Sequence, residues 1–194
     1  MNKRCVALTQ EQYQESISLL RSGFTLDGVS IRPNNRIATV AVLQACLGLR
    51  LGDTLKLKMS SFIKDGDRWR LDIVEQKTKK TRTFTVPVEI YSFIQEYAYD
   101  LGIGRNVKLF DISARQVERH LLKVFQKMGL GIKNFSSHSY RKFFATKVFV
   151  ENNYNIEIVR VLLQHSSIAT TQRYIGISQK EIEDALQKMI KNVA

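Results

Sequence analysis

Cysteine and long hydrophobic runs are scarce in this sequence. The two cysteines, Cys5 and Cys46, lie far apart, with no C-x-x-C motif and no histidine close to either. This spacing argues against a zinc site or a disulfide framework and predicts free thiols in a reducing compartment. The longest apolar run, residues 37–49, is too short to span a bilayer, and residues 9–12 are polar where a signal peptide needs its apolar core. We therefore expect a cytoplasmic protein without a membrane segment.

Nucleotide-binding and metal-binding motifs are also missing. The sequence contains no Walker motif, no Rossmann glycine pattern and no carboxylate cluster for magnesium, so we expect neither a cofactor nor a metal. Acidic residues are the minority charge, because 18 Asp and Glu stand against 30 Lys and Arg, a formal net charge of +12. Double-stranded DNA is the expected partner of such a basic chain. A solvated basic surface is the alternative; no lipid anchor or lipidation signal supports a membrane surface.

Hydrophobic periodicity predicts a mainly helical, mixed α+β chain that forms one domain of 194 residues. Thr9 and Gln12 form a capping box at the start of a first helix. Residues 22–35 contain glycines and a proline and are expected to be a loop, whereas residues 36–50 are apolar nearly all round and predict a central buried helix. Residues 62–86 predict a small antiparallel sheet. Further amphipathic helices are expected at 88–101, 114–128 and 178–192.

The residues best suited to chemistry concentrate in one helical segment near the end of the chain. His138 and Arg141 open a helical pattern, and their spacing of three places both on one face of the first turn. A second helix ends at a Gln-His-Ser-Ser turn that contains His165, and Tyr174 follows nine positions later. Two imidazoles, a guanidinium and a phenol together suit a phosphate. Each of them alone is more often a structural residue, so the combination carries the prediction.

This combination resembles the catalytic domain of the tyrosine recombinases, or phage-type integrases. The family's H-x-x-R box matches His138 and Arg141, its L-G-H-S box matches residues 163–166, and its nucleophile matches Tyr174. One departure is Gln164, which stands where a glycine usually precedes the histidine. The resemblance extends from about residue 8 to the end of the chain.

The family's first catalytic arginine lies in a G-L-R-x-x-E/D box, which residues 48–53 fit, with Arg50 as the arginine and Asp53 as the acid. A guanidinium next to a core needs an anionic partner, and Asp53 would hold Arg50 in place while leaving donors for a phosphate. Considered without the resemblance, the pair is equally well explained as a structural ion pair.

A basic turn within the predicted sheet is the third part of the resemblance. The family carries a catalytic lysine in a hairpin of the type K-T-x-K-x-R-x-x-x-P, whose first lysine matches Lys77. Lys79 or Lys80 could replace it. A solvated charged turn is the alternative, although a basic tip also suits a DNA groove. The DNA-binding residues that we expect are Lys79, Lys80, Arg82 and, beside the nucleophile, Arg173.

The resemblance implies a site-specific recombinase that cleaves and rejoins DNA through a 3′-phosphotyrosyl intermediate, in integration, excision or inversion. Arg50, Arg141 and His165 would stabilise the transition state, His138 would accept the tyrosine proton or orient the phosphate, and Lys77 would protonate the departing 5′-oxygen. No metal or ATP would be required. The alternatives are a DNA-binding protein of the same fold that does not cleave, and a type IB topoisomerase that relaxes supercoils.

The family also implies an assembly. We expect residues 1–194 to form a catalytic domain without the N-terminal core-binding domain of most members. The helix at 178–192 either packs on its own domain or docks on a neighbouring protomer. A homotetramer on DNA is expected, with a monomer or weak oligomer in its absence, and an accessory DNA-bending protein is a further candidate partner.

Overall fold

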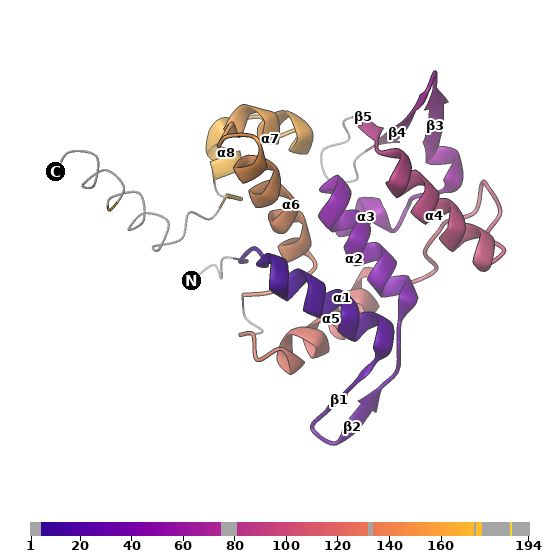
Figure 1. Ribbon diagram of the computed structural model, residues 1–194. Coiled ribbons are helices and arrows are strands. Elements are labelled where there is room, and N and C mark those ends of the chain that lie inside the picture. The colour runs from indigo at the N-terminus through magenta and orange to yellow at the C-terminus, as the bar shows by residue number, and fades with distance from the viewer. Residues whose placement is uncertain (1–4, 75–80, 132–133, 173, 176–186, 188–194) are drawn as a thin grey trace.

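The computed structural model describes residues 5–74, 81–131, 134–172, 174–175 and 187. Helices dominate this part of the chain, and two small antiparallel sheets complete it (Figure 1). The helices are α1 (Gln10–Ser22), α2 (Asn35–Leu47), α3 (Leu51–Thr54), α4 (Val88–Asp100), α5 (Ala114–Lys127), α6 (His138–Glu151), α7 (Ile156–Leu163) and α8 (Ile168–Gln172), with a 3-10 turn at Met59–Ser61. The strands are β1 (Phe24–Leu26), β2 (Val29–Ile31), β3 (Phe62–Asp65), β4 (Arg68–Val74) and β5 (Thr81–Val86).

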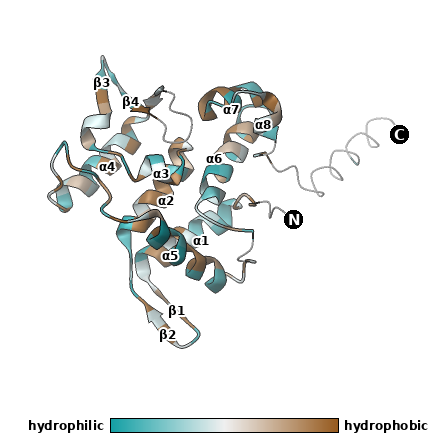
Figure 2. Ribbon diagram, turned by 180° about the vertical axis from the view of Figure 1, so that it is seen from behind, coloured by the Kyte–Doolittle hydropathy of each residue, from teal (hydrophilic) through white to brown (hydrophobic). Residues whose placement is uncertain are grey.

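Helix α2 is the centre of the fold, as its all-round apolar sequence predicts. It contacts α1, α3, α4 and α6, and it is hydrophobic along most of its length (Figure 2). The helix is shorter than expected: it ends at Leu47, where Gly48 adopts a left-handed conformation with φ 59°. Arg50 therefore lies outside α2, in an extended conformation just before α3. The capping box of Thr9 and Gln12 at the start of α1 is confirmed.

The expectation of a loop at residues 22–35 is wrong. Strands β1 and β2 pair there as a hairpin, with Phe24 opposite Ile31 and Leu26 opposite Val29. The turn between the strands is Asp27-Gly28, and both residues have positive φ, at 49° and 77°. An Asp-Gly pair is a strong signal for such a two-residue turn, so the sequence did contain the information.

The predicted antiparallel sheet is confirmed in the described residues 62–74 and 81–86, in the order β3-β4-β5. Strand β4 pairs with β5 from Trp69 opposite Val86 to Val74 opposite Thr81. Helix α4 lies against the sheet, and Tyr91 on it stacks on Trp69 with an interplanar angle of 8°. The sheet stands at one side of α2, and α6, α7 and α8 stand at the other (Figure 1).

The buried apolar residues form two clusters. The larger one surrounds α2 and includes residues of α1, α4, α5 and the sheet. The smaller one joins the second half of α6 to α7 and to Ile175, three residues after α8 ends, through Ala145, Val159, Leu163 and Ile175; Tyr174 packs on its edge. Among the described helices, none has both the length and the apolar character of a membrane span. The smaller cluster holds Tyr174 and Ile175, which follow α8.

Candidate active site

The ring of Tyr174 lies among basic side chains. The centroid of its ring is 4.6 Å from that of His165 and 4.9 Å from that of His138. The guanidinium carbon of Arg141 and the ammonium nitrogen of Lys142 each lie 5.7 Å from the same centroid. The structure thus brings together four residues that the sequence predicted as a catalytic set, and it adds Lys142.

Arg141 lies at the centre of this cluster and is fully buried. Its Nη1 donates to the carbonyl oxygen of Gly48, and its Nη2 donates to the carbonyl oxygen of Leu163 at 3.2 Å. Nη2 also lies 3.5 Å from Nε2 of His165. Because Gly48 follows α2 and Leu163 ends α7, one guanidinium connects the C-terminal ends of two helices.

These carbonyl groups explain how a charged side chain can be buried there. The last carbonyls of a helix have no partner within the helix and carry the negative end of the helix dipole. They satisfy the guanidinium donors of Arg141 with partial charges, whereas a carboxylate would supply a full negative charge. These two contacts therefore stabilise Arg141 and leave most of its positive charge available to attract an anion.

A carboxylate holds the start of α6, where His138 and Arg141 lie. Glu118 on α5 accepts hydrogen bonds from the Ser137 hydroxyl at 2.5 Å and from the Ser137 backbone N–H at 3.1 Å. The backbone N–H of His138 donates to the Ser136 hydroxyl oxygen at 3.2 Å. Helix N-terminal N–H groups need such acceptors, and a negative charge there interacts favourably with the helix dipole. The N-terminus of α6 is thereby fixed relative to α5.

Arg50 and Asp53 form the ion pair that the sequence suggested. Nη1 of Arg50 is 4.0 Å from Oδ2 of Asp53, and the two side chains are 20% and 3% exposed.

Gly48, two residues before Arg50, has no room for a side chain, because a Cβ there would lie 2.5 Å from a ring carbon of Phe144. The close approach of α6 and the end of α2 therefore requires glycine at this position.

His165 lies in the turn after α7 and is 5% exposed. Its backbone N–H donates to the carbonyl oxygen of Arg160 at 3.0 Å, and Nη1 of Arg160 donates back to the carbonyl oxygen of His165 at 3.1 Å. Gln164 before it is left-handed, with φ 52° and ψ 42°. This conformation suits glycine, which explains physically why a glycine is common at this position in the family. The side chain of His165 contacts Thr171, with 3.0 Å between Nδ1 and Oγ1.

The basic turn of the sheet, with Lys77, Lys79 and Lys80, lies outside the described residues. Arg173, beside Tyr174, lies outside them as well. Arg82 belongs to β5, but its side chain is not described either. The base of the turn is described: Nε2 of Gln164 donates to the carbonyl oxygen of Thr81 at 3.5 Å. The start of β5 therefore lies next to the end of α7, beside His165.

Lys142 and Thr171 were not singled out in the sequence analysis. Lys142 is buried within α6 even though it carries a charge. A lysine between Arg141 and a Phe-Phe pair, inside an otherwise packed helix, was a signal that could have been used. Thr171 gave no comparable signal, because threonine is common in short polar turns.

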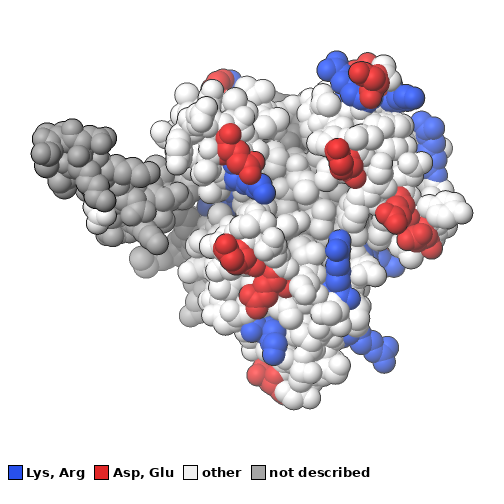
Figure 3. Space-filling view, viewed as in Figure 1, with Lys and Arg blue, Asp and Glu red and all other residues white. Residues whose placement is uncertain are grey.

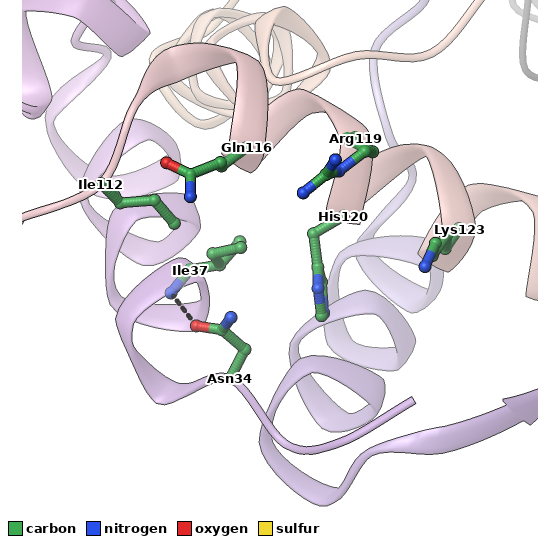
Figure 4. A pocket seen from close by; sticks show the side chains of 7 residues that line it. All are labelled: Asn34, Ile37, Ile112, Gln116, Arg119, His120 and Lys123. Carbon is green, nitrogen blue, oxygen red and sulfur yellow. Dashed lines mark hydrogen bonds between the residues drawn. The ribbon is translucent and has the colours of Figure 1, made fainter. Parts of the chain in front are cut away.

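A second basic feature is a pocket of about 330 Å³ between the start of α2 and helix α5 (Figure 4). Arg119, His120 and Lys123 of α5 line it, together with Asn34, the N-cap residue of α2. Nε2 of His120 is buried and has no hydrogen-bond partner among the described residues. Burial lowers the pKa of His120, and the charge of Lys123 lowers it further.

The surface charge gives no single dominant patch on the face seen in Figure 3. Basic and acidic side chains alternate there over the described residues. Within the same part of the chain, no group of three or more His, Cys, Asp or Glu side chains could hold a metal ion.

Residues 8–181 match the model of the phage integrase family. The chain belongs to this family. Among its curated relatives, the probable integrase/recombinase of Acholeplasma phage L2 is 28% identical over 148 residues, which cover 74% of this chain and 49% of the relative. Tyrosine recombinase XerA of Pyrococcus furiosus is 25% identical over 170 residues, 82% of this chain and 57% of the relative. This phage integrase family chain thus spans about half the length of the curated relatives it matches.

Solved structures confirm the expected tyrosine recombinase catalytic fold. XerH site-specific recombinase bound to palindromic difH substrate, in a post-cleavage complex, superposes with a TM-score of 0.73 and 18% identity over 93% of this chain and 51% of XerH. The catalytic domain of bacteriophage HP1 integrase superposes with a TM-score of 0.61 and 18% identity over 94% of both chains. At these identities the likeness concerns the fold.

Proposed function

We propose that this chain is the catalytic domain of a site-specific tyrosine recombinase, which cleaves and rejoins DNA strands through a 3′-phosphotyrosyl intermediate. The observation that carries the proposal is the position of the Tyr174 ring, within 5 Å of two imidazole rings and within 6 Å of the Arg141 guanidinium, by ring centroids. These are the residue types, at the sequence positions, that match the family's boxes.

The proposed chemistry follows from what each side chain can do. A phenol has an ordinary pKa of about 10 and is a poor nucleophile at neutral pH, so cations and a proton acceptor must assist it. Oη of Tyr174 attacks the phosphorus, the bond from phosphorus to the 5′-oxygen breaks, and the 3′-phosphate becomes attached to the tyrosine. His138 accepts the tyrosine proton or orients the phosphate, and Lys77 gives a proton to the departing 5′-oxygen.

The developing negative charge needs fixed positive partners. Arg141 and His165 are buried and are held by contacts with helix ends, so they require little rearrangement to meet the charge. Arg50, aligned by Asp53, would complete the set. The new bond to tyrosine conserves the energy of the phosphodiester, and a second 5′-hydroxyl can therefore reverse the reaction without ATP.

Double-stranded DNA is the proposed partner. XerH is bound to its difH substrate and lambda integrase, as a dimer, to a core site in their solved complexes. We propose that Lys79, Lys80, Arg82 and Arg173 contact the backbone near Tyr174. Arg119 and Lys123, at the pocket beside α2, are suited to phosphates farther along the duplex.

The assembly on DNA is also a proposal. A homotetramer holding two duplexes would supply the four strand exchanges of a complete recombination, with a monomer or weak oligomer in the absence of DNA. The helix predicted at 178–192 would dock on the neighbouring protomer, and an accessory DNA-bending protein would assist. The cytoplasm is the compartment in which this reaction would take place.

The test is covalent capture of DNA. The protein is incubated in EDTA with a pool of randomised, labelled duplexes that carry a nick near the presumed cleavage position. After cleavage, the short fragment with the released 5′-hydroxyl diffuses away, so the strand cannot be rejoined and the covalent intermediate accumulates. Wild-type protein should form a labelled adduct that resists SDS. Tyr174→Phe should form none, and Tyr99→Phe, which alters a tyrosine that is 85% exposed, should behave like the wild type.

Three results would contradict the proposal. An adduct that persists in Tyr174→Phe would exclude Tyr174 as the nucleophile. The absence of any adduct from duplexes that the protein demonstrably binds would favour a DNA-binding protein that does not cleave. Relaxation of supercoiled plasmid without sequence preference would instead indicate topoisomerase-like activity.

A further inference from the structure

Thr171 makes hydrogen bonds to two residues of the candidate catalytic centre, His165 and Tyr174. It lies in α8 and is fully buried. Its Oγ1 is 3.0 Å from Nδ1 of His165, and its hydroxyl also donates to the carbonyl oxygen of Ser167 at 3.4 Å. Its own carbonyl oxygen accepts the backbone N–H of Tyr174 at 2.8 Å. One residue thus contacts the side chain of a candidate phosphate ligand and the backbone of the candidate nucleophile.

The contacts of His165 determine which of its nitrogens carries the proton. Nη2 of Arg141 is 3.5 Å from Nε2, and a guanidinium can only donate hydrogen bonds. Nε2 must therefore present its lone pair to Arg141 in the neutral imidazole, and the proton lies on Nδ1. The hydroxyl proton of Thr171 is directed to Ser167, so Oγ1 is left to accept from Nδ1–H.

We propose that Thr171 is a positioning residue for DNA cleavage: its hydroxyl holds His165 as the Nδ1-protonated tautomer, and its carbonyl holds the backbone of Tyr174. This inference rests on the proposed function, since it assigns Thr171 a role through His165 and Tyr174. It follows that Nε2 is the nitrogen on the Arg141 side, where the phosphate would bind. In the imidazolium form Nε2 also carries a proton and donates to a phosphate oxygen, while Thr171 still accepts from Nδ1–H. A histidine ligand generally needs such a partner on its other nitrogen to fix ring orientation and tautomer.

The variants separate the hydroxyl from the packing of the side chain. Thr171→Val keeps the shape and removes the hydroxyl, whereas Thr171→Ser keeps the hydroxyl and removes a methyl group. Thr170→Val is the matched control: Thr170 is the preceding residue of α8, and its hydroxyl contacts Ser167 at 3.0 Å. All variants are compared by their cleavage rate on captured suicide duplexes in single-turnover conditions and by their affinity for the same DNA.

The second measurement requires no activity. Long-range proton–nitrogen NMR distinguishes protonated from unprotonated imidazole nitrogens, and the chain contains only three histidines, which single substitutions can assign. His165 of the wild type should carry its proton on Nδ1. Thr171→Ser and Thr170→Val should retain this tautomer. Thr171→Val leaves Nδ1–H without its 3.0 Å acceptor and only the 3.5 Å contact with Arg141 to favour it, so the preference should weaken measurably.

The expected cleavage rates follow the same order. Thr171→Val should cleave about tenfold more slowly than the wild type, the change that loss of one orienting neutral hydrogen bond produces. Its DNA affinity should be unchanged. Thr171→Ser, which keeps the hydroxyl, should cleave at the wild-type rate. A wild-type His165 protonated on Nε2 overturns the proposal without any variant, and so does Thr171→Ser cleaving as slowly as Thr171→Val. If the tautomers are as expected but the wild type forms no adduct on any duplex, the proposed function fails, and with it the role of Thr171 in cleavage.

Discussion

Replacement of Gln164 by glycine should give a more stable protein than replacement by alanine. Gln164 ends α7 in a left-handed conformation, with φ 52° and ψ 42°. For a residue with a Cβ this conformation costs about 1–2 kcal/mol, because the Cβ approaches the following carbonyl oxygen. Glycine avoids that contact, and glycine is also the residue commonly found at this position in the phage integrase family.

Gln164→Ala is the reference for the change in stability, because alanine shares the Cβ of glutamine but lacks its amide. Relief of about 1–2 kcal/mol is offset by about 0.5–1 kcal/mol, the greater conformational entropy of glycine in the unfolded chain. Gln164→Gly should therefore be about 0.5–1 kcal/mol more stable than Gln164→Ala. Both variants lose the hydrogen bond from Gln164 to the Thr81 carbonyl oxygen, so this term cancels. For a chain of this size, the Tm of Gln164→Gly should be about 1–4 °C above that of Gln164→Ala.

The assay is chemical denaturation, with thermal unfolding as a second probe. Gln14, an exposed residue within α1, provides a matched control with the opposite sign. Gln14→Gly should be about 1 kcal/mol less stable than Gln14→Ala, because glycine is unfavourable in a right-handed helix. A Gln164→Gly protein no more stable than Gln164→Ala would refute the strain argument.

Two further predictions concern stability. Gly48→Ala should lower the free energy of unfolding by about 2–5 kcal/mol, because it adds left-handed strain and a clash with Phe144. Gly66→Ala is the control: Gly66 has a similar φ but open space around it, so its replacement should add only the strain. Equal losses of stability in a denaturant titration would contradict the clash. His120 should make the fold less stable in acid. Burial, and then the charge of Lys123, lower the folded pKa of His120 below its ordinary value of about 6.5. The neutral ring therefore contributes its full stability above about pH 6.5, and this stability is lost as the pH falls from there through the lowered folded pKa. Stability measured at about pH 7.5 and about pH 5.5 should differ more for the wild type than for His120→Gln, and equal differences would exclude this role.

The elements of the fold were predictable where one local signal was sufficient. Thr9 and Gln12 mark the start of α1, and the apolar run at 36–50 marks α2. The hairpin at Asp27-Gly28 is hard to predict, because glycine and proline also mark loops and its two strands, of three residues each, are too short to show alternation. Short strands carry little periodicity, so the turn residues have to be weighed by turn type.

The membership of the candidate site was predictable from spacing, but its internal contacts were not. His138 and Arg141 lie in the first turn of α6, as the spacing indicates, and His165 and Tyr174 lie beside them. Thr171 could not be recognised, because its contact with His165 depends on how α8 folds back after α7. The roles of all these residues in catalysis remain predictions for the capture experiment.

The burial of Arg141 shows why the remaining contacts escape sequence reasoning. An arginine in a helix beside aromatic residues suggests either an exposed charge or a carboxylate partner. Instead, its guanidinium reaches carbonyl oxygens at the ends of α2 and α7, groups that every helix possesses and no side-chain pattern encodes. Such acceptors exist only after the helices have packed. A site that uses partial charges to hold a cation can retain that cation's attraction for phosphate, and this property follows from the tertiary arrangement rather than from any motif.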